Sequence, residues 1–186
     1  MLMLALTRSA AYVPLGRAPA SRPATRSAPV NMLTEGQIGL IRSTWSSVGA
    51  LGSEKVGVLL FEKIFEEAPG AAELFPFGRE PDFTLDNLGD NPRVVKHGAK
   101  VVDTVSTAVD LLDDLPTLGP VLVGLGARHF TYSVEAVHYP VVGGAFLKTL
   151  ETGLGEAYTK EVAEAYTAMW GVVETTMLSG ADAPKK

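Results

Sequence analysis

The stretch NPRVVKHGAKVVDTVSTAVDLL, residues Asn91–Leu112, predicts one long amphipathic helix around which the rest of the chain is organised. Asp90 and Asn91 are residue types that cap helix N-termini, and Pro92 suits the first turn, where an N–H would have no partner. Positions 94, 97, 101, 105 and 108 recur at spacings of three and four and therefore share one face. The residues on this face are Val94, His97, Val101, Val105 and Ala108.

One histidine, His97, interrupts this otherwise apolar face, and two interpretations of it stay open. Most histidines on an apolar stripe are core or boundary residues that have found a hydrogen-bond partner. A neutral imidazole in the same place can instead bind a metal or a cofactor. Since the helix alone does not distinguish the two, the decision depends on the other elements of the chain.

The composition is that of one globular domain. The chain has 186 residues, of which 46% are hydrophobic, and this is enough for a sizeable core. It contains no cysteine, which excludes disulfides, thiolate zinc sites, iron–sulfur clusters and a cysteine nucleophile. The formal net charge of −5 argues against a nucleic-acid partner, for which a basic face is expected. No apolar run reaches about 18 residues, so no membrane span is predicted.

The first 33 residues differ in composition from the rest. They hold four arginines and no acidic residue, and they are rich in Ala, Ser and Pro, which is typical of an organelle transit peptide. The apolar opening MLMLAL, followed by SAAYVP, resembles the two-part presequences of plastid proteins in algae with complex plastids. We therefore expect residues 1–33 to be a disordered targeting presequence for the plastid. The alternatives are a mitochondrial address, or a cytoplasmic protein whose N-terminal segment is no presequence.

Two helices are predicted at the start of the folded domain. Thr34 and Gln37 form a capping box, with Leu33 and Ile38 placed as a hydrophobic staple. Ser53 is the expected cap of the second helix, which runs to about residue 68. The expected buried residues are Ile38, Ile41, Trp45 and Val48 in the first helix and Val56, Leu60, Phe61, Ile64 and Phe65 in the second.

Three further helices are predicted after the central one, at about residues 115–130, 138–152 and 157–178. The first of these should turn Val121, Leu122, Leu125 and His129 to one side, and its three glycines weaken it by roughly 1 kcal/mol each relative to Ala. Packing or a bound group must therefore hold it. No segment shows the two-residue alternation of a strand. The sequence predicts an all-α domain over residues 34–180, with a loop at 78–90 and a flexible tail at 181–186.

Taken together, these residues resemble those of a globin, specifically of the neuroglobin and cytoglobin branch, from Leu33 to about Leu178. Phe75 precedes His97 by 22 residues and His97 precedes His129 by 32, the separations expected of that branch. The matching motifs are Asn91-Pro92, His97-Gly98 and Lys100-Val101 in one helix, Leu125-Gly126-Ala127-Arg128-His129 in another, and Pro69 and Leu74-Phe75 before them. Trp45, Val134, Tyr139 and Trp170 also fall on globin core or pocket positions.

The resemblance implies a globin fold, with helices A, B, C, E, F, G and H around a pocket for haem b. It makes His129 the proximal ligand of the iron and Phe75 the ring that stacks on the haem. It makes His97 the distal histidine, which either donates a hydrogen bond to bound O₂ or binds the iron itself. The likeness to neuroglobins favours bis-histidyl, six-coordinate iron in the gas-free state. Leu125 lies one turn before His129, where its carbonyl oxygen can accept the other ring N–H.

The remaining site residues are expected from the same resemblance. Lys100 and Arg128 are candidate partners of the haem propionates, with solvated surface charge as the alternative, and His138 is expected to be structural or exposed. A dry pocket, which slows oxidation of the iron, is expected from Phe61, Phe75, Val101, Leu125, Val134 and Tyr139.

The chain also departs from related globins. Phe61 stands where flavohaemoglobins and many truncated globins place a distal tyrosine, which argues against very high O₂ affinity. Phe77 replaces a tyrosine that contacts a propionate in neuroglobins. Without cysteines, the disulfide control of that family is missing. No reductase domain is recognised, so turnover is expected to need an external electron donor.

Three functions follow from this sequence. The first is reversible binding of O₂, NO or CO for local storage, scavenging or sensing. The second is NO dioxygenation, with a separate reductase that restores the ferrous iron. The third is a haem-free globin-like signalling module, which has no need for two inward histidines. The first two share one site, and the sequence does not separate them.

Overall fold

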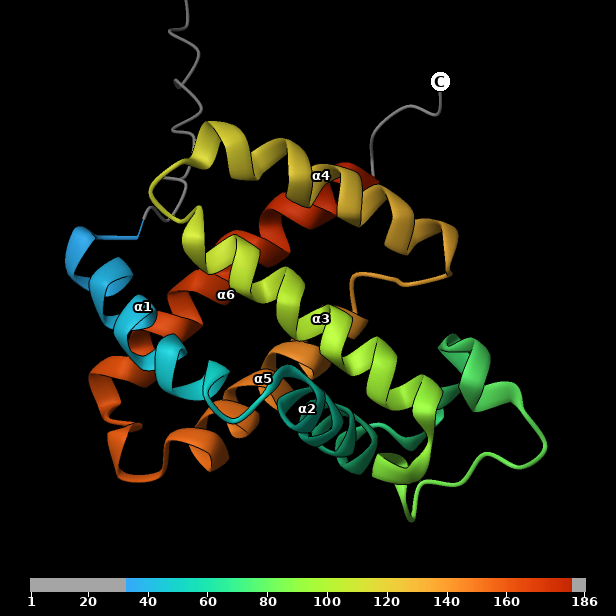
Figure 1. Ribbon diagram of the computed structural model, residues 1–186. Helices are drawn as coiled ribbons and strands as arrows, with labels where there is room; N and C mark the ends of the chain where they lie inside the picture. Colours follow the sequence, from blue (N-terminus) through green and yellow to red (C-terminus); the bar gives the residue numbers. More distant parts are fainter. Residues whose placement is uncertain (1–32, 182–186) are drawn as a thin grey trace, which may run out of the picture.

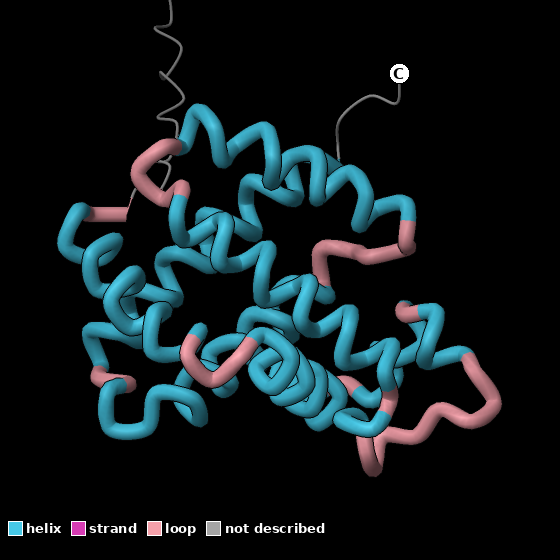
Figure 2. Tube along the Cα trace, viewed as in Figure 1, coloured by secondary structure: helices cyan, strands magenta, loops and turns pink. Residues whose placement is uncertain are grey.

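The computed structural model of the chain describes residues 33–181, which form helices and loops with no strand in that range. The bundle and its connections are shown in Figure 1 and Figure 2. The predicted all-α class is confirmed, whereas the proposed presequence and C-terminal tail lie almost wholly outside the described residues. The α-helices are α1 (Glu35–Gly49), α2 (Ser53–Glu67), α3 (Pro92–Asp110), α4 (Leu115–Thr131), α5 (His138–Leu154) and α6 (Lys160–Ala181). The 3₁₀-helices are η1 (Pro69–Leu74), η2 (Pro76–Arg79), η3 (Leu88–Asp90) and η4 (Gly155–Ala157).

Two helices start as the sequence predicts. The Thr34 hydroxyl accepts a hydrogen bond from the Gln37 N–H at 3.2 Å, and the Gln37 side chain accepts from the Thr34 N–H at 2.9 Å. This is the capping box of α1. At α3, the Asn91 side chain accepts from the Arg93 N–H at 3.0 Å, with Pro92 in the first turn. Both central predictions about helix starts are confirmed.

The prediction that Ser53 caps α2 was wrong. The N-cap is Gly52, whose φ of 91° lies in the left-handed region that favours glycine. The Ser53 hydroxyl instead donates to the carboxylate of Asp103 on α3, at 2.7 Å. A contact between two helices therefore takes the hydroxyl away from the local cap.

Two boundaries also differ from those expected. The last helix begins at Lys160 rather than at about residue 157, because Gly155, with φ of 52°, ends α5 and opens η4. The predicted loop at residues 78–90 contains the end of η2 and all of η3. Both differences concern short 3₁₀ turns, which leave little trace in a hydrophobic pattern.

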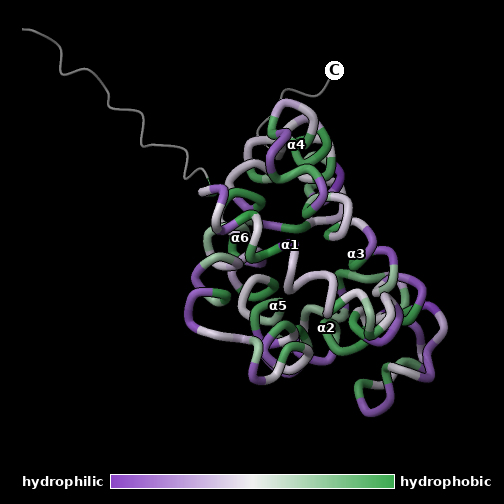
Figure 3. Tube along the Cα trace, turned by 60° about the vertical axis from the view of Figure 1, so that its left-hand side comes forward, coloured by the Kyte–Doolittle hydropathy of each residue, from purple (hydrophilic) through white to green (hydrophobic). Residues whose placement is uncertain are grey.

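The helices are arranged so that α3 and α4 diverge from the turn at residues 111–114 (Figure 1). α2 packs against α3 on one side and α5 on the other, whereas α4 packs mainly along α6. Figure 3 shows this from a second side, with α4 at one end of the molecule and α2 and α5 at the other. None of the helices described between residues 33 and 181 is long and apolar enough to cross a bilayer.

The crossing of α2 and α3 is built on two glycines. A Cβ at Gly57 would lie 2.6 Å from the Cα of Gly98, and a Cβ at Gly98 would lie 2.7 Å from the carbonyl carbon of Gly57. Both neighbours are backbone atoms, so a side chain at either position cannot be accommodated by turning a rotamer. The two helices therefore touch backbone to backbone, which fixes the rotation of α3 about its axis.

Gly57→Ala should lower the free energy of unfolding by about 1–3 kcal/mol, because the added methyl forces α2 and α3 apart in a packed core. The matched control is Gly39→Ala in α1, where a Cβ meets nothing within 4 Å. That change should be neutral or stabilise the protein by up to about 1 kcal/mol through helix propensity. Urea unfolding followed by circular dichroism measures both. Equal stability of the two variants would contradict the backbone contact.

Candidate functional site

The α3 helix presents two adjacent stripes where the sequence predicted one apolar face. The first stripe is buried against neighbouring helices and consists of Val94, Gly98, Val102 and Val109. On the second stripe, His97 is exposed and Val101 and Val105 are half-buried. The Gly57 crossing explains the difference, since it draws the line of Gly98 into the core. The stripe of His97 is left with apolar side chains that the protein only partly covers.

The α4 helix is divided in the same way. Leu118, Leu122 and Gly126 are buried, and His129 and Leu125 are half-buried. The expected inward position of Val121 is corrected, because its side chain is 48% exposed. The α6 helix covers the face of α4 that carries Gly126. The neighbouring face, which carries His129, is less covered.

The His129 ring is oriented by its own helix. Its Nδ1 lies 2.9 Å from the carbonyl oxygen of Leu125, one turn earlier, as the sequence predicted. A carbonyl oxygen can only accept, so Nδ1 carries the proton and donates. When the ring is neutral, this bond leaves the lone pair on Nε2, the atom that a metal ligand uses.

The chain turns sharply just after His129. The His129 carbonyl oxygen accepts from the N–H of Val134 at 3.1 Å, and Ser133, with φ of 65°, donates to the carbonyl of Phe130 at 3.1 Å. These two bonds form a Schellman motif with a serine where glycine is usual. The turn ties Val134, an expected pocket residue, to the end of the His129 helix.

His97 lies against three phenylalanine rings. Its ring centroid is 5.6 Å from those of Phe61 and Phe75 and 6.1 Å from that of Phe77. It makes no hydrogen bond within residues 33–181, so the interpretation as a core histidine with a polar partner is not met by the described residues. The ring is enclosed by aromatic carbon on one side and open on the other.

The pKa of His97 lies below the ordinary 6.5 of histidine. Desolvation by the surrounding rings is the main cause, and the positive charge of Lys100, and that of His129 when it is protonated, lower the pKa further. The open side of the ring limits this desolvation, but all three causes act in one direction and keep the imidazole neutral. Because a protonated His129 acts on His97, the two rings, one from α3 and one from α4, lie near each other.

The phenylalanine cluster extends beyond the residues that the sequence singled out. Phe61 is 2% exposed and meets Phe75 edge to face at 5.1 Å. Phe77, noted in the sequence only as a replacement, is 4% exposed and stacks on Phe75 at 5.1 Å with an interplanar angle of 7°. Phe65 and Phe83 complete the cluster. The high frequency of phenylalanine between residues 61 and 83 is the feature of the sequence from which this cluster could have been predicted.

Tyr139 and His138 open α5. Tyr139 is 7% exposed, and burial, with a smaller effect from the charge of Glu174, raises the pKa of its hydroxyl. The His138 Nδ1 accepts a hydrogen bond from the Glu135 N–H at 2.9 Å, which gives this histidine the structural role expected of it. The Tyr139 hydroxyl thus stays protonated. The Nδ1 of His138 is taken up by its hydrogen bond with Glu135, so this histidine is not grouped with His97 and His129.

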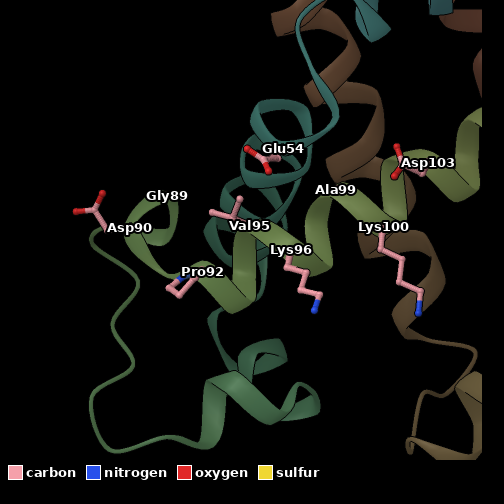
Figure 4. A pocket seen from close by; sticks show the side chains of 9 residues that line it. All are labelled: Glu54, Gly89, Asp90, Pro92, Val95, Lys96, Ala99, Lys100 and Asp103. Carbon is pink, nitrogen blue, oxygen red and sulfur yellow. The ribbon is translucent and has the colours of Figure 1, made fainter.

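The basic residues Lys100 and Arg128 are exposed and form no ion pair within the described residues. Lys100 also lines a shallow surface groove of about 680 Å³ on the outer side of α3. Figure 4 shows the ammonium groups of Lys96 and Lys100 pointing to one edge of the helix, and the carboxylates of Glu54 and Asp103 to the other. None of the three histidines lines this groove, so it is separate from the histidine site.

Lys100→Met should raise the pKa of His97, because it removes the second of the three causes that lower it. As the pH is lowered, His97 of the unfolded chain takes up a proton near pH 6.5, whereas His97 of the folded chain does so only at a lower pH. The contribution of His97 to the free energy of unfolding is therefore complete above that pH, and it is lost as the pH falls through the lowered pKa of the folded protein. The variant should lessen this loss. NMR titration of the His97 ring in haem-free protein is the measurement, with Lys96→Met as the control that should leave the pKa in place.

The comparisons with known proteins agree with this arrangement. Residues 58–177 match the family model described as Globin. Neuroglobin of Danio rerio is 35% identical over 150 residues, which cover 80% of this chain and 92% of that protein. Cytoglobin-2 of Danio rerio is 29% identical over 138 residues, covering 74% of this chain and 76% of that protein.

A solved structure shows the same fold. It is the hexa-coordinate haemoglobin of Drosophila melanogaster, with a TM-score of 0.71 and 19% sequence identity. The match covers 78% of this chain and 93% of that one. The globin fold expected from the sequence is confirmed, and this chain belongs to the globin family, with neuroglobins and cytoglobins among its relatives.

Proposed function

We propose that this globin binds haem b between α3 and α4 and reversibly binds O₂, and also NO and CO, at the iron. Local storage, scavenging or sensing of a gas is its role. The observation that carries the proposal is the pair of histidines on these two helices: His97 lies against phenylalanine rings, and the Nδ1 of His129 is held by the Leu125 carbonyl oxygen. In a globin, such a pair has a direct use as ligands on the two sides of a haem.

The residues present fit a haem. A flat, apolar macrocycle would cover the half-buried stripe of Val101 and Val105 on α3 and Leu125 on α4. Burial of such surface contributes roughly 25 cal/mol for each Å² removed from water. The unpaired cations Lys100 and Arg128 suit the two propionates, as charged partners at a solvent-facing edge.

When bound, haem iron supplies a coordination position that takes a diatomic gas. The chain's own residues then set the behaviour of that position. His129 offers Nε2, because Leu125 holds the proton at Nδ1. The rings of Phe61, Phe75 and Phe77 keep water from the His97 side, which protects the iron against oxidation.

We further propose that His97 is a reversible sixth ligand in the gas-free protein. Its lowered pKa keeps a lone pair available at neutral pH, and no hydrogen bond within residues 33–181 occupies it. A gas must then displace His97, so the apparent affinity is reduced by the fraction of protein in the closed form. The neuroglobin relatives and the hexa-coordinate haemoglobin of Drosophila melanogaster support this proposal by analogy.

NO dioxygenation is the second candidate. The aromatic enclosure of His97 favours it, because apolar gases such as NO and O₂ both enter a dry, apolar space. In this reaction NO, O₂ and one electron give nitrate, so a separate reductase must supply the electron. Consumption of NO by the purified protein, with and without an added reductase and its reduced nicotinamide, measures this activity. Sustained turnover only with the reductase supports the enzyme, and one turnover under both conditions supports reversible binding alone.

Haem titration of the purified full-length chain tests the proposed function. One haem per chain, with an absorption spectrum typical of histidine ligation in the ferric and ferrous states, is the expected result. A well-folded helical protein that takes up no haem would contradict it and would favour the haem-free signalling module. Circular dichroism on the same sample establishes that the protein is folded.

We propose that the N-terminal segment is a plastid presequence, with the mitochondrion as the alternative address. Its support is compositional, the four arginines without acidic residues. A reporter fused to residues 1–33 should enter the organelle of a suitable alga. Retention of the reporter in the cytosol would leave a cytoplasmic globin.

A protein that lacks residues 1–32 should fold and bind haem as tightly as the full chain does. The cut keeps Leu33, which packs against the core, and the capping box that starts α1. Thermal unfolding and haem titration of both proteins measure this prediction. A loss of more than about tenfold in haem affinity, or roughly 1.4 kcal/mol, would show that the globin domain begins earlier.

A further inference from the structure

The helix that carries His129 is held in place mainly by α6. Within the described chain, the main helix–helix interface of α4 is the one with α6 (Figure 1, Figure 3). α4 is also intrinsically weak, because it contains Pro120 and the glycines Gly119, Gly124 and Gly126. The position of α4 therefore depends on how it meets α6.

α4 and α6 meet through two backbone contacts, each made by a glycine, which we call the glycine seam: Gly126 of α4 lies against Met177 of α6, and Gly180 of α6 lies against Val123 of α4. A Cβ at Gly126 would overlap the carbonyl oxygen of Met177 and lie 2.6 Å from its carbonyl carbon. A Cβ at Gly180 would overlap the carbonyl oxygen of Val123 and lie 2.9 Å from its carbonyl carbon. The two contacts are reciprocal, and the neighbours on both sides are backbone atoms, which cannot move aside as a flexible side chain can.

The seam is directly connected to the orientation of His129. The Leu125 carbonyl that accepts from His129 Nδ1 belongs to the peptide unit between Leu125 and Gly126. Because a peptide unit is planar, the backbone contact of Gly126 with Met177 limits the direction in which that carbonyl points. The carbonyl in turn sets the direction of the ring. A shift of the backbone contact at Gly126 would therefore turn the peptide plane, and with it the imidazole of His129.

We propose that Gly126 and Gly180 are positioning residues that set the geometry of His129 toward the haem iron. This inference rests on the proposed role of His129 as haem ligand. A methyl group at either glycine pushes α4 away from α6, turns the peptide unit of Leu125 and strains the bond between His129 and the iron.

The variants Gly126→Ala and Gly180→Ala test the seam from both helices. The first readout is the iron–histidine stretching band of the photolysed CO complex, in which His97 is absent from the iron. The second is the rate of haem transfer to excess apomyoglobin. Both seam variants should shift the band and speed haem transfer by about tenfold or more, as expected for an overpacked contact. If Gly126→Ala fails to fold, Gly180→Ala tests the other contact of the same interface without a change in α4.

The controls are Gly124→Ala and Gly119→Ala on the same helix, where a Cβ meets nothing within 4 Å. They should leave the band in place and the transfer rate within about twofold. Normal haem uptake with an unchanged band and transfer rate in both seam variants would overturn the positioning role, as would an equal shift in the controls. Absence of haem uptake by the unmutated protein would overturn the proposed function first, and the positioning role with it.

Discussion

His129→Ala protein will lose tight haem binding, with an affinity at least about 100-fold below that of the unmutated protein. Loss of an outer-shell partner of a metal ligand typically costs about 10–100-fold, and loss of the ligand itself should cost more. His129 is the histidine of α4 with an oriented ring and a free Nε2. Haem titration followed by absorbance, with transfer to apomyoglobin as a second measurement, gives the size of the effect.

Two further variants make this result specific. His138→Ala removes a histidine whose Nδ1 is bonded to the Glu135 N–H, and it should leave haem affinity within about twofold. His129→Gly with added imidazole should recover the histidine-ligated spectrum, because the free imidazole replaces the missing ring. Tight haem binding by His129→Ala without imidazole would contradict the assignment of the proximal ligand.

Local features of the fold could be predicted from the sequence with little loss. The capping box of Thr34 and Gln37 and the Asn91 cap of α3 involve residues within three positions of each other, so spacing alone defines them. The hydrogen bond from His129 to Leu125 is of the same kind, because four residues make one helical turn. Those features of the site that depend on residues within one helical turn could therefore be predicted from the sequence.

The features that were missed depend on contacts between distant segments. Ser53 donates to Asp103, 50 positions away, and no local rule predicts that partner. The rotation of α3, which buries the line of Gly98 rather than that of His97, follows from its backbone contact with Gly57. Glycine spacing marks such crossings only when the partner helix is known, which is also why the contact of Gly126 with α6 was not predicted.

His97→Leu should convert the gas-free ferrous protein from six- to five-coordinate iron and speed the observed binding of CO. If the closed form accounts for about 99% of the molecules, CO binding should become about 100-fold faster, because the open fraction limits the reaction. The same change removes a hydrogen-bond donor from bound O₂. That bond is worth about 1–3 kcal/mol in a dry site, so O₂ dissociation should be roughly 5- to 150-fold faster.

His97→Gln separates the two roles of this histidine. An amide still donates a hydrogen bond but is a poor iron ligand, so the variant should be five-coordinate and keep O₂ dissociation slow relative to His97→Leu. The surrounding rings of Phe61, Phe75 and Phe77 are unchanged in both variants. Stopped-flow mixing with CO and with O₂ measures the two rates. Identical O₂ dissociation from both variants would show that His97 donates no hydrogen bond to the gas.

The absorption spectrum of the unmutated, gas-free ferrous protein distinguishes whether His129 and His97 hold the iron from opposite sides. We expect sharp, split low-spin bands, and these should collapse to one broad band in His97→Leu. A broad high-spin band in the unmutated protein would contradict this expectation and would leave a five-coordinate globin in which His97 never binds the iron.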